Sequence, residues 1–252
     1  MADKAKILIV GETWITHSVH TKGFDSFSTA HFGEGYSYLK KALEGGDFDV
    51  DVIENHVAAT DFPDNVEALR KYSTIILSDI GANTLLLTPP TWRQSQIVPN
   101  RLQVIADYVD AGGGLIMVGG YLTFMGIEAK GFWKDTPVEK CLPVTMMATD
   151  DRREHPQGVT ALTVDGSHPV LSGVTGEWPK LLGYNRVFVR DDAKLLATIE
   201  GDPLLAVGTC GEGRAAVFTS DCSPHWCPHD FIDWPGYAAM WRNLCGWTSQ
   251  AR

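Results

Sequence analysis

The densest group of side chains able to do chemistry lies in residues 219–230, which read TSDCSPHWCPHD. His225 can act as a general base or hold a ligand, because an imidazole exchanges its proton near neutral pH. Asp221 stands four residues earlier and can orient the ring, while Trp226 offers a flat apolar face to a ligand. The segment therefore predicts an acid–base or ligand-binding site.

Other interpretations of this segment stay open. Cys222 could be a nucleophile activated by His225, which requires only that the two groups come within hydrogen-bonding distance. A packed loop in which Asp221 caps a turn explains the residues equally well, because the prolines of the segment stiffen the chain. A zinc site is not predicted, since spacings of three, two and two residues are tighter than the separated pairs that usually surround a tetrahedral ion. The zinc ligands in question would be Cys222, His225, Cys227 and His229.

Two further groups of candidate residues follow predicted strands. Glu12, Trp14 and His17 lie in residues 11–20, where we expect a polar loop with groups able to bind a ligand or titrate. Asp79 follows another apolar run and could orient a ligand, although capping of its own turn is the commoner role of such an aspartate. The loop at 11–20 lacks the glycine patterns that hold phosphates or dinucleotides, and we predict no cofactor.

The last group is the turn at Gly120 and Tyr121, which follows the apolar run 115–118. Hydrolases and amidotransferases with a doubly wound sheet place a nucleophile on such an elbow. Tyr121 stands at that position, and a phenol with a pKa of about 10 is a poor nucleophile at neutral pH. We therefore expect Tyr121 to donate a hydrogen bond rather than to attack a substrate.

These residues need a scaffold that gathers strand ends, and the hydrophobic pattern predicts one. Continuous apolar runs indicate strands buried on both faces of a parallel sheet, whereas alternating polarity indicates an edge strand. Strands are expected at 6–10, 72–79 and 115–120, with an edge strand at 49–53. Helices are expected at 35–43 and 100–111, a polar segment at 12–32 and a proline-containing loop at 84–96. Strands that alternate with helices predict a doubly wound α/β fold with helices on both faces of the sheet.

The second half of the chain is less regular and suggests added antiparallel strands. The strand candidates are residues 162–164, 185–189, 195–199, 204–208 and 215–219, and residues 211–214 are expected to form a hairpin turn. A final amphipathic helix is expected, with one face made by Tyr237, Met240, Trp241, Leu244 and Trp247. Because no linker or repeat interrupts the pattern, we expect residues 1–252 to form a single domain.

Composition excludes several classes of partner. Lys and Arg total 21 against 31 Asp and Glu, and a net charge of −10 argues against a nucleic acid partner. The apolar runs are far shorter than the roughly 20 residues that cross a bilayer, so no membrane partner is predicted. Five cysteines without a C-x-x-C pair are typical of reduced thiols, and the N-terminal residues do not read as a secretory signal. We expect a cytoplasmic protein.

Five phrases carry a resemblance to a known family. They are GGGLIMVGGY at 112–121, GFWKDTPVE at 131–139, HPVLSG at 168–173, GEGR at 211–214 and TSDCSPHW at 219–226. The chain resembles the glutamine amidotransferase-like family, which belongs to the class I glutamine amidotransferase-like superfamily and is related to the ThuA-like trehalose-utilisation proteins. This resemblance implies a flavodoxin-like sheet and a single class I glutamine amidotransferase-like domain.

The resemblance also implies a departure in chemistry. True amidotransferases attack glutamine with a cysteine on the elbow, helped by a histidine that follows a late strand. Here Tyr121 occupies the elbow and only His225 lies near the position of that histidine. Without a thiolate at that place, glutamine hydrolysis is not expected, because fold alone does not fix chemistry.

The sequence leaves two functions open. The first is a small-molecule protein, with a carbohydrate-related ligand, that uses the strand-end cleft for binding or for catalysis without a covalent step. Its site would combine His225, Asp221, Tyr121, Glu12, Trp14, His17, Asp79, Gly120 and Trp226. The second is a non-catalytic oligomerisation or interaction module that presents part of the eight tryptophans, for example on the final helix. A glutaminase that uses Cys222 is a third, less favoured reading, and a homo-oligomer is compatible with each.

Overall fold

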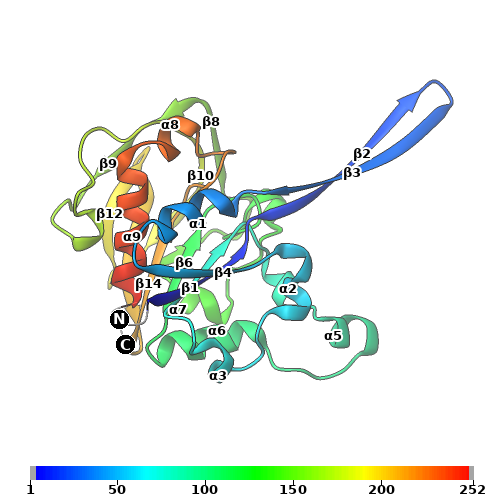
Figure 1. The fold of residues 1–252 in the computed structure, drawn as a ribbon, viewed down its shortest axis with the longest axis horizontal. Helices are drawn as coiled ribbons and strands as arrows, with labels where there is room; N and C mark the ends of the chain where they lie inside the picture. The colour runs from blue at the N-terminus through cyan, green and yellow to red at the C-terminus, as the bar shows by residue number, and fades with distance from the viewer. Residues whose placement is uncertain (1–3, 250–252) are drawn as a thin grey trace.

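The computed structural model describes residues 4–249, which are built around an eight-stranded sheet (Figure 1). The strands of this sheet are β1 (Ala5–Gly11), β4 (Phe48–Ile53), β5 (Thr74–Ser78), β6 (Gly114–Val118), β9 (Ala161–Thr163), β12 (Lys194–Ile199), β13 (Asp202–Cys210) and β14 (Gly213–Phe218). Their order is β4-β1-β5-β6-β14-β13-β12-β9. The first five are parallel to one another, and the last three add to the sheet in antiparallel fashion.

The parallel strands confirm the predictions made from continuous apolar runs. Every residue of β5 and β6 is buried, because helices cover both faces of the sheet at these positions. The alternating segment forms β4 at the edge of the sheet, as its polarity predicts. The fold is the doubly wound, flavodoxin-like α/β class that the sequence indicates.

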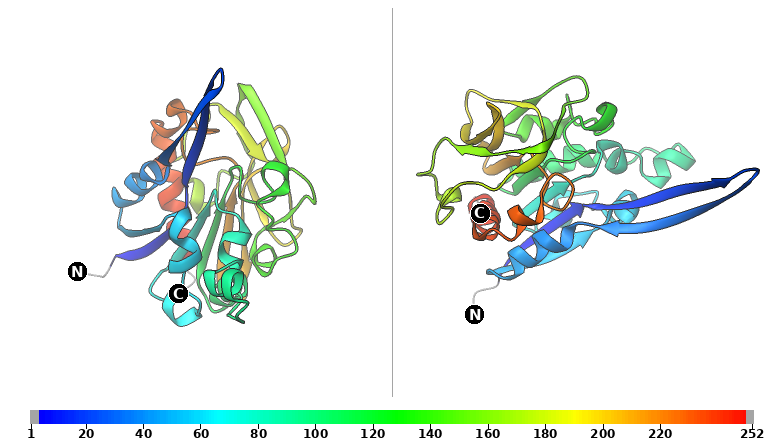
Figure 2. Two further views of the ribbon diagram at one scale, coloured as in Figure 1. Left: turned by 90° about the vertical axis from the view of Figure 1, so that its right-hand side faces the viewer. Right: turned by 90° about the horizontal axis from the view of Figure 1, so that it is seen from above.

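Two layers of helices enclose the sheet (Figure 2). One face is covered by α1 (Tyr36–Glu44) and α9 (Pro235–Ser249). The other is covered by α2 (Asn55–Asp61), α3 (Val66–Leu69), α4 (Ala82–Leu86), α6 (Arg101–Asp110) and α7 (Pro137–Cys141). The remaining helices are α5 (Pro89–Gln94), α8 (His229–Ile232) and two single 3₁₀ turns, Ile127–Ala129 and Pro169–Leu171. The predicted helices at 35–43 and 100–111 are α1 and α6.

The prediction of a loop at residues 84–96 is wrong, because α4 and α5 occupy most of it. Pro89 and Pro90 stand in the first turn of α5. A proline there loses no intrahelical hydrogen bond, and its fixed φ suits the helix, so the pair begins a helix instead of breaking one.

The second half extends the sheet as predicted. Strands β12, β13 and β14 match the candidates at 195–199, 204–208 and 215–219, and Cys210 pairs with Gly213 across a tight turn. The turn begins at Gly211, whose φ of +55° favours glycine. Four short strands form two small ladders beside the sheet: β8 (Arg152–Val159) with β10 (Leu181–Asn185), and β7 (Val144–Met146) with β11 (Val187–Val189).

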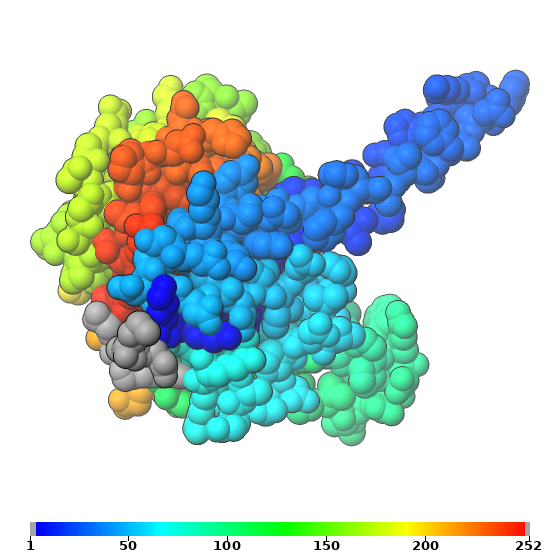
Figure 3. All heavy atoms as spheres, viewed as in Figure 1, coloured from blue at the N-terminus to red at the C-terminus, as the bar shows by residue number. Residues whose placement is uncertain are grey.

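The polar segment predicted at residues 12–32 is instead a long hairpin. Its strands are β2 (Thr13–Lys22) and β3 (Asp25–Glu34), paired without a break around Gly23. We call residues 13–34 the arm; it projects from the body of the molecule (Figures 1 and 3). The backbone N of Gly35 donates to the carbonyl of Glu12 at 2.9 Å, so the chain leaves the body and returns to it at one point. Side chains of Thr, Val, Ile and Phe favour strands, which explains why the segment is not a loop.

The final helix α9 packs into the core with the predicted face. Trp241 is fully buried and Tyr237 is 2% exposed, both against the sheet. The alternative that Trp241 helps to form an interaction surface is therefore wrong. Within residues 4–249, every helix is too short or too polar to span a bilayer.

Candidate functional site

A cavity of about 500 Å³ opens at the carboxyl ends of the parallel strands. Strands β1, β5, β6 and β14 each end at it, and the segment after each strand contributes side chains. In doubly wound sheets, ligands bind at this edge. The cavity is lined by Glu12, Trp14, Asp79, Tyr121, Leu122, Ile127, Asp221, Ser223, Pro224 and His225. Six of the nine site residues predicted from sequence thus meet in one place: Glu12, Trp14, Asp79, Tyr121, Asp221 and His225.

Glu12 follows β1 and is held at the floor of the cavity. It has a left-handed φ of +56° and is 1% exposed. The hydroxyl of Ser78 donates to Glu12 Oε2 at 2.5 Å, and that of Ser223 donates to Oε1 at 2.6 Å. Burial, and next the charges of Asp221 and Asp79, raise the pKa of Glu12 well above its ordinary value. This carboxyl therefore keeps its proton at pH values where an exposed glutamate has lost it.

Asp79 occupies the turn between β5 and α4 in another left-handed conformation, with a φ of +44°. Its Oδ1 accepts a hydrogen bond from the backbone N of Leu122 at 2.8 Å, so it ties the β6 turn in place instead of capping its own. Burial, together with the charge of Asp221, raises its pKa to about 6. Tyr121 is not among the left-handed residues of residues 4–249, so the strained strand–turn–helix position belongs to Asp79 and not to Tyr121.

Asp221 and His225 form a hydrogen-bonded pair after β14. Asp221 Oδ2 lies 3.2 Å from His225 Nδ1, and Asp221 Oδ1 accepts from the backbone N of Ser223 at 3.1 Å. Burial alone would lower the pKa of His225, but the hydrogen bond and charge of Asp221, with the charge of Asp79, raise it above its ordinary value. The side chain of His225 is 38% exposed, whereas that of Asp221 is 5% exposed. The aspartate is thus placed to orient an imidazole that faces the cavity.

Aromatic contacts fix the rings around His225. The rings of Tyr121 and His225 meet edge to face with centroids 4.3 Å apart, and the guanidinium of Arg152 lies 4.9 Å from the centre of the Tyr121 ring. Burial, with the charge of Glu154 and a hydrogen bond to it, raises the pKa of Tyr121, which keeps its hydroxyl neutral. Trp226 stacks on His225 with ring centroids 5.1 Å apart and also meets the Tyr121 ring at 5.7 Å.

Three residues predicted for the site do not line the cavity. Trp226 is 1% exposed and its Nε1 donates to Glu154 Oε2 at 2.9 Å, so it supports His225 and offers no face to a ligand. His17 lies on the exposed part of the arm. Gly120 is buried, and a Cβ there would approach Asp79 Oδ1 to 2.9 Å, so a side chain at this position would crowd the Asp79 carboxyl.

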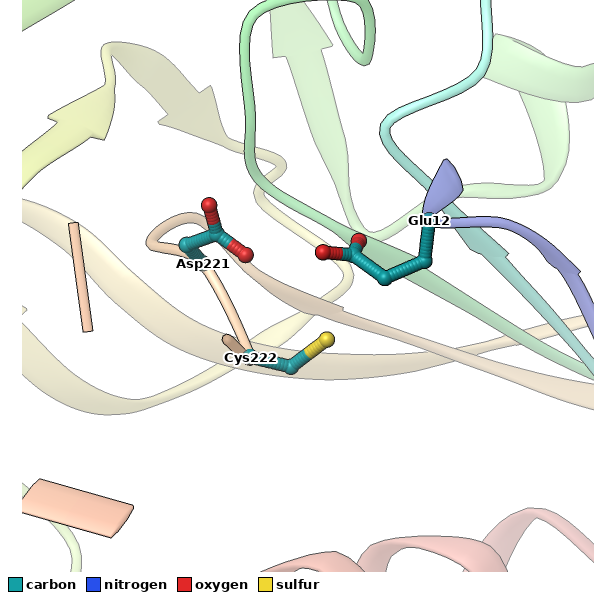
Figure 4. A group of neighbouring side chains, drawn as sticks. All are labelled: Glu12, Asp221 and Cys222. Atoms are coloured by element: carbon teal, nitrogen blue, oxygen red, sulfur yellow. The ribbon is translucent and has the colours of Figure 1, made fainter. Parts of the chain in front are cut away.

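Cys222 lies next to Asp221 and Glu12 (Figure 4) and belongs to the hydrophobic core. It is fully buried, its Sγ is 3.5 Å from Ser78 Oγ, and burial, with the charges of Glu12 and Asp221, raises its pKa well above the ordinary value. A thiol in that state is a poor nucleophile. Among the described residues, the hydrogen-bonding neighbour of Cys222 Sγ is Ser78 and not His225, so the geometry does not support a Cys222–His225 dyad.

The ligand set considered for zinc is not brought together. In the part of the chain that the structure describes, the one group spaced for a metal ion is Glu12, Asp221 and Cys222, whose ligand atoms lie within 4.8 Å of one another. Both carboxylate oxygens of Glu12 already accept hydrogen bonds from serines, and the raised pKa values of Glu12 and Cys222 favour the protonated forms that do not bind metals. His229 contacts the ring of Tyr38 instead.

Sequence reasoning missed the two serines that hold Glu12. Ser78 is the last residue of β5, and Ser223 comes five residues after the end of β14. Only Ser78 could have been found from the sequence, because it ends a predicted parallel strand and such ends meet at one edge of the sheet. Leu122 and Ile127, which supply apolar lining, were also missed.

Comparisons with known proteins agree with this architecture. The model of the family described as "Putative glutamine amidotransferase" matches residues 6–250. Two solved structures from Salmonella typhimurium are similar throughout. Cytoplasmic protein STM3548 is 44% identical, with 96% of this chain and 98% of that one covered and a TM-score of 0.93. Cytoplasmic protein STM1381, from strain LT2, is 46% identical, with 96% of this chain and 99% of that one covered and a TM-score of 0.93.

More distant structures share the fold alone. A "Putative thua-like protein" from Parabacteroides merdae has 14% identity, with 99% of this chain and 91% of that one covered and a TM-score of 0.59. The search among curated proteins found no match. Because the family model covers nearly the whole sequence, the chain belongs to the glutamine amidotransferase-like family.

Proposed function

We propose that this protein binds a small, hydroxyl-rich, carbohydrate-related molecule in the strand-end cavity and acts on it through acid–base groups, with no cysteine nucleophile and no cofactor. The observation that carries the proposal is the Asp221–His225 pair facing a cavity of about 500 Å³ beside two buried carboxyls with raised pKa values. Titratable groups displaced in this way, inside a cleft, are typical of functional sites.

The lining of the cavity supports the ligand class. Glu12, Asp79 and Asp221 are acidic, and the described residues that line the cavity include neither Lys nor Arg, which disfavours an anionic ligand. Carboxyl oxygens accept hydrogen bonds from hydroxyl groups. Trp14, which is 41% exposed on the rim, offers an apolar ring face. The resemblance to trehalose-utilisation proteins points in the same direction.

Each residue then has a defined task. His225 is the general base or the ligand anchor, since its imidazole faces the cavity, and Asp221 is a positioning residue that acts through His225. Tyr121 donates a hydrogen bond from its neutral hydroxyl. Glu12 supplies a carboxyl that holds its proton, and Asp79 supplies an acceptor.

Calorimetric titration tests this proposal directly. The wild-type protein is titrated with neutral mono- and disaccharides, with a sugar phosphate and with glutamine. We expect binding of a neutral sugar, weakened about tenfold or more by His225→Gln or Trp14→Ala. His229→Gln is the matched control, because His229 lies in the same segment but outside the cavity. A wild-type protein that binds none of the sugars, or His225→Gln with unchanged affinity, would contradict the proposal.

The positioning role of Asp221 has a separate readout. In Asp221→Asn, NMR titration of the imidazole should show a lower pKa for His225 than in the wild type, because the hydrogen bond and charge that raise it are gone. An unchanged pKa would leave Asp221 a structural residue only.

We further propose that the protein works in the cytoplasm. The two Salmonella relatives, 44% and 46% identical, are titled cytoplasmic proteins. All five cysteines are free thiols, which suits a reducing compartment.

A further inference from the structure

We propose that the arm, residues 13–34, is a self-association element that packs against the arm of a second copy of this chain. Apart from Trp14 at its root, which lines the cavity, neither the cavity nor the core accounts for it. Beyond its root the arm is solvent-exposed on both faces, although a two-stranded hairpin alone is marginally stable in water. A hairpin of this length is expected to gain its stability from further strands or from a packed face.

The arm exposes apolar side chains that a partner would cover. Phe24 at the tip is fully exposed, Val19 is 72% exposed and Phe27 53% exposed. Ile15 and Phe32 pair across the strands and are each close to half exposed. Phe24 is fully exposed whereas Phe27 and Phe32 are each about half exposed, so the three rings leave about 300–500 Å² for a partner to bury. With the two aliphatic side chains, this apolar area makes up about half or more of the roughly 800 Å² that each partner gives to an ordinary stable interface.

Between Ile15 and Phe32, one face of the arm is mostly apolar and carries no acidic or basic residue of the Asp, Glu, Lys or Arg type. Side chains alternate along each strand, so Ile15, His17 and Val19 share a face with their cross-strand partners Phe32, Ala30 and Ser28. None of these six is Lys, Arg, Asp or Glu. A surface of this kind, extended over about half of the ladder, is what a protein partner buries.

The edges of the arm also lack the devices that keep free strands apart. Natural proteins protect exposed edges with prolines, bulges or charged side chains. Between Trp14 and Thr21, and again between Ser26 and Gly33, there is no Pro, Lys, Arg, Asp or Glu, and the ten residue pairs of the ladder run without a bulge. The outward backbone groups of both strands are therefore free to pair with another strand.

A second copy of this chain is the partner that these features fit. It supplies a strand of identical length whose edges are equally unprotected, and a twofold arrangement places the same apolar face on both sides. Each chain carries a net charge of −10, but the arm contributes only Lys22, Asp25 and Glu34, a net −1. Two arms can therefore meet without the repulsion that two acidic bodies would exert.

Sedimentation velocity of the purified chain tests the proposal. Protein concentrations up to about 100 μM are high enough to detect a dimer of modest affinity. We expect a dimer or a larger species in the wild type. Val19→Lys and Phe32→Lys should each weaken association at least about tenfold, because a charge would be buried in the interface. A shortened arm, in which Asn-Gly replaces residues 16–31 between the paired Ile15 and Phe32, should be monomeric.

The matched control is Ile97→Lys, which replaces a fully exposed aliphatic side chain away from the arm and should leave association unchanged. Circular dichroism and thermal melting of each variant show whether the body is still folded. A wild type that is monomeric at every concentration overturns the proposal, as does an oligomer that survives shortening of the arm. In the latter case some other surface holds the copies together.

Discussion

At the scale of single residues, the site is held in conformations that the chain otherwise avoids. Glu12 and Asp79, directly after β1 and β5, both have positive φ, a region unfavourable for residues other than glycine. Each outlier turns a carboxyl toward the same cavity, where burial raises its pKa. Strain and unfavourable burial at one place are typical of function, since neither improves the stability of the fold.

Asp79→Asn should stabilise the protein in a pH-dependent way. The pKa of Asp79 is about 6 in the folded chain against an ordinary 3.8, so the wild type loses stability as the pH rises from about 4 to about 6. The difference between the variant and the wild type should therefore grow over that window and level off above it, approaching about 3 kcal/mol. The asparagine Oδ1 can still accept from Leu122, so the turn stays tied.

Calorimetric melting temperatures from pH 4 to pH 8 measure this difference. Asp230→Asn, an exposed aspartate in α8, is the control and should show no such trend. A difference for Asp79→Asn that does not change with pH would mean that the carboxyl is not held near pKa 6.

At the scale of elements, the sequence predicts the strands and helices whose apolar pattern is set by burial in the core. Strands β5 and β6 are apolar throughout because they are covered on both faces, and α6 has the predicted stripe, begun by Asn100 and followed by Gly112. The arm is missed because no core imposes a pattern on it: Ser, Thr and His fill positions that a buried strand would give to apolar residues. The prolines of α5 mislead because their effect depends on helix position, which local composition does not reveal.

The burial of α9 is open to a direct test. Trp241 is fully buried and contacts the ring of Phe218 from β14, with centroids 5.3 Å apart. Trp241→Ala should cost about 3–5 kcal/mol in the free energy of unfolding, because it leaves a large cavity. Trp92→Ala, which truncates a 70% exposed tryptophan on α5, should change it by less than about 0.5 kcal/mol. Urea unfolding of both variants measures the contrast, and equal effects would mean that α9 is not part of the core.

At the scale of the whole molecule, topology explains both the success and the failures of site prediction. Residues that directly follow parallel strands, such as Glu12, Asp79 and Asp221, converge because a doubly wound sheet brings those ends to one edge. His17 and Trp226 fail for a different reason. Whether a side chain a few positions further along faces the cavity, the core or open solvent depends on how the segment packs, and the sequence does not show that packing.

Thiol reactivity reports on the same architecture. Cys210 is half-buried, and its Sγ is hydrogen-bonded to that of Cys141 at 2.7 Å, which lowers the pKa of Cys210. The other four cysteines are at most 5% exposed. Ellman's reagent should therefore modify Cys210 first in the native protein and all five thiols after denaturation.

Two variants complete the thiol experiment. Cys210→Ser should abolish the rapid phase, whereas Cys222→Ser should preserve it. Loss of the rapid phase in Cys222→Ser would show that this thiol is accessible and would reopen the question of glutamine hydrolysis.

The closed root of the arm has a consequence for how this fold can diversify. Because Glu12 and Gly35 are joined by a backbone hydrogen bond, everything between them is an insertion into a single strand-to-helix connection. Each doubling of such an insertion costs only about 0.6 kcal/mol in chain entropy, so its length can drift with little penalty to the body. The same place can accept a foreign domain or the new termini of a circular permutant. Replacement of the arm beyond its root by another segment would thus change the binding partners of the protein and leave the cavity unchanged.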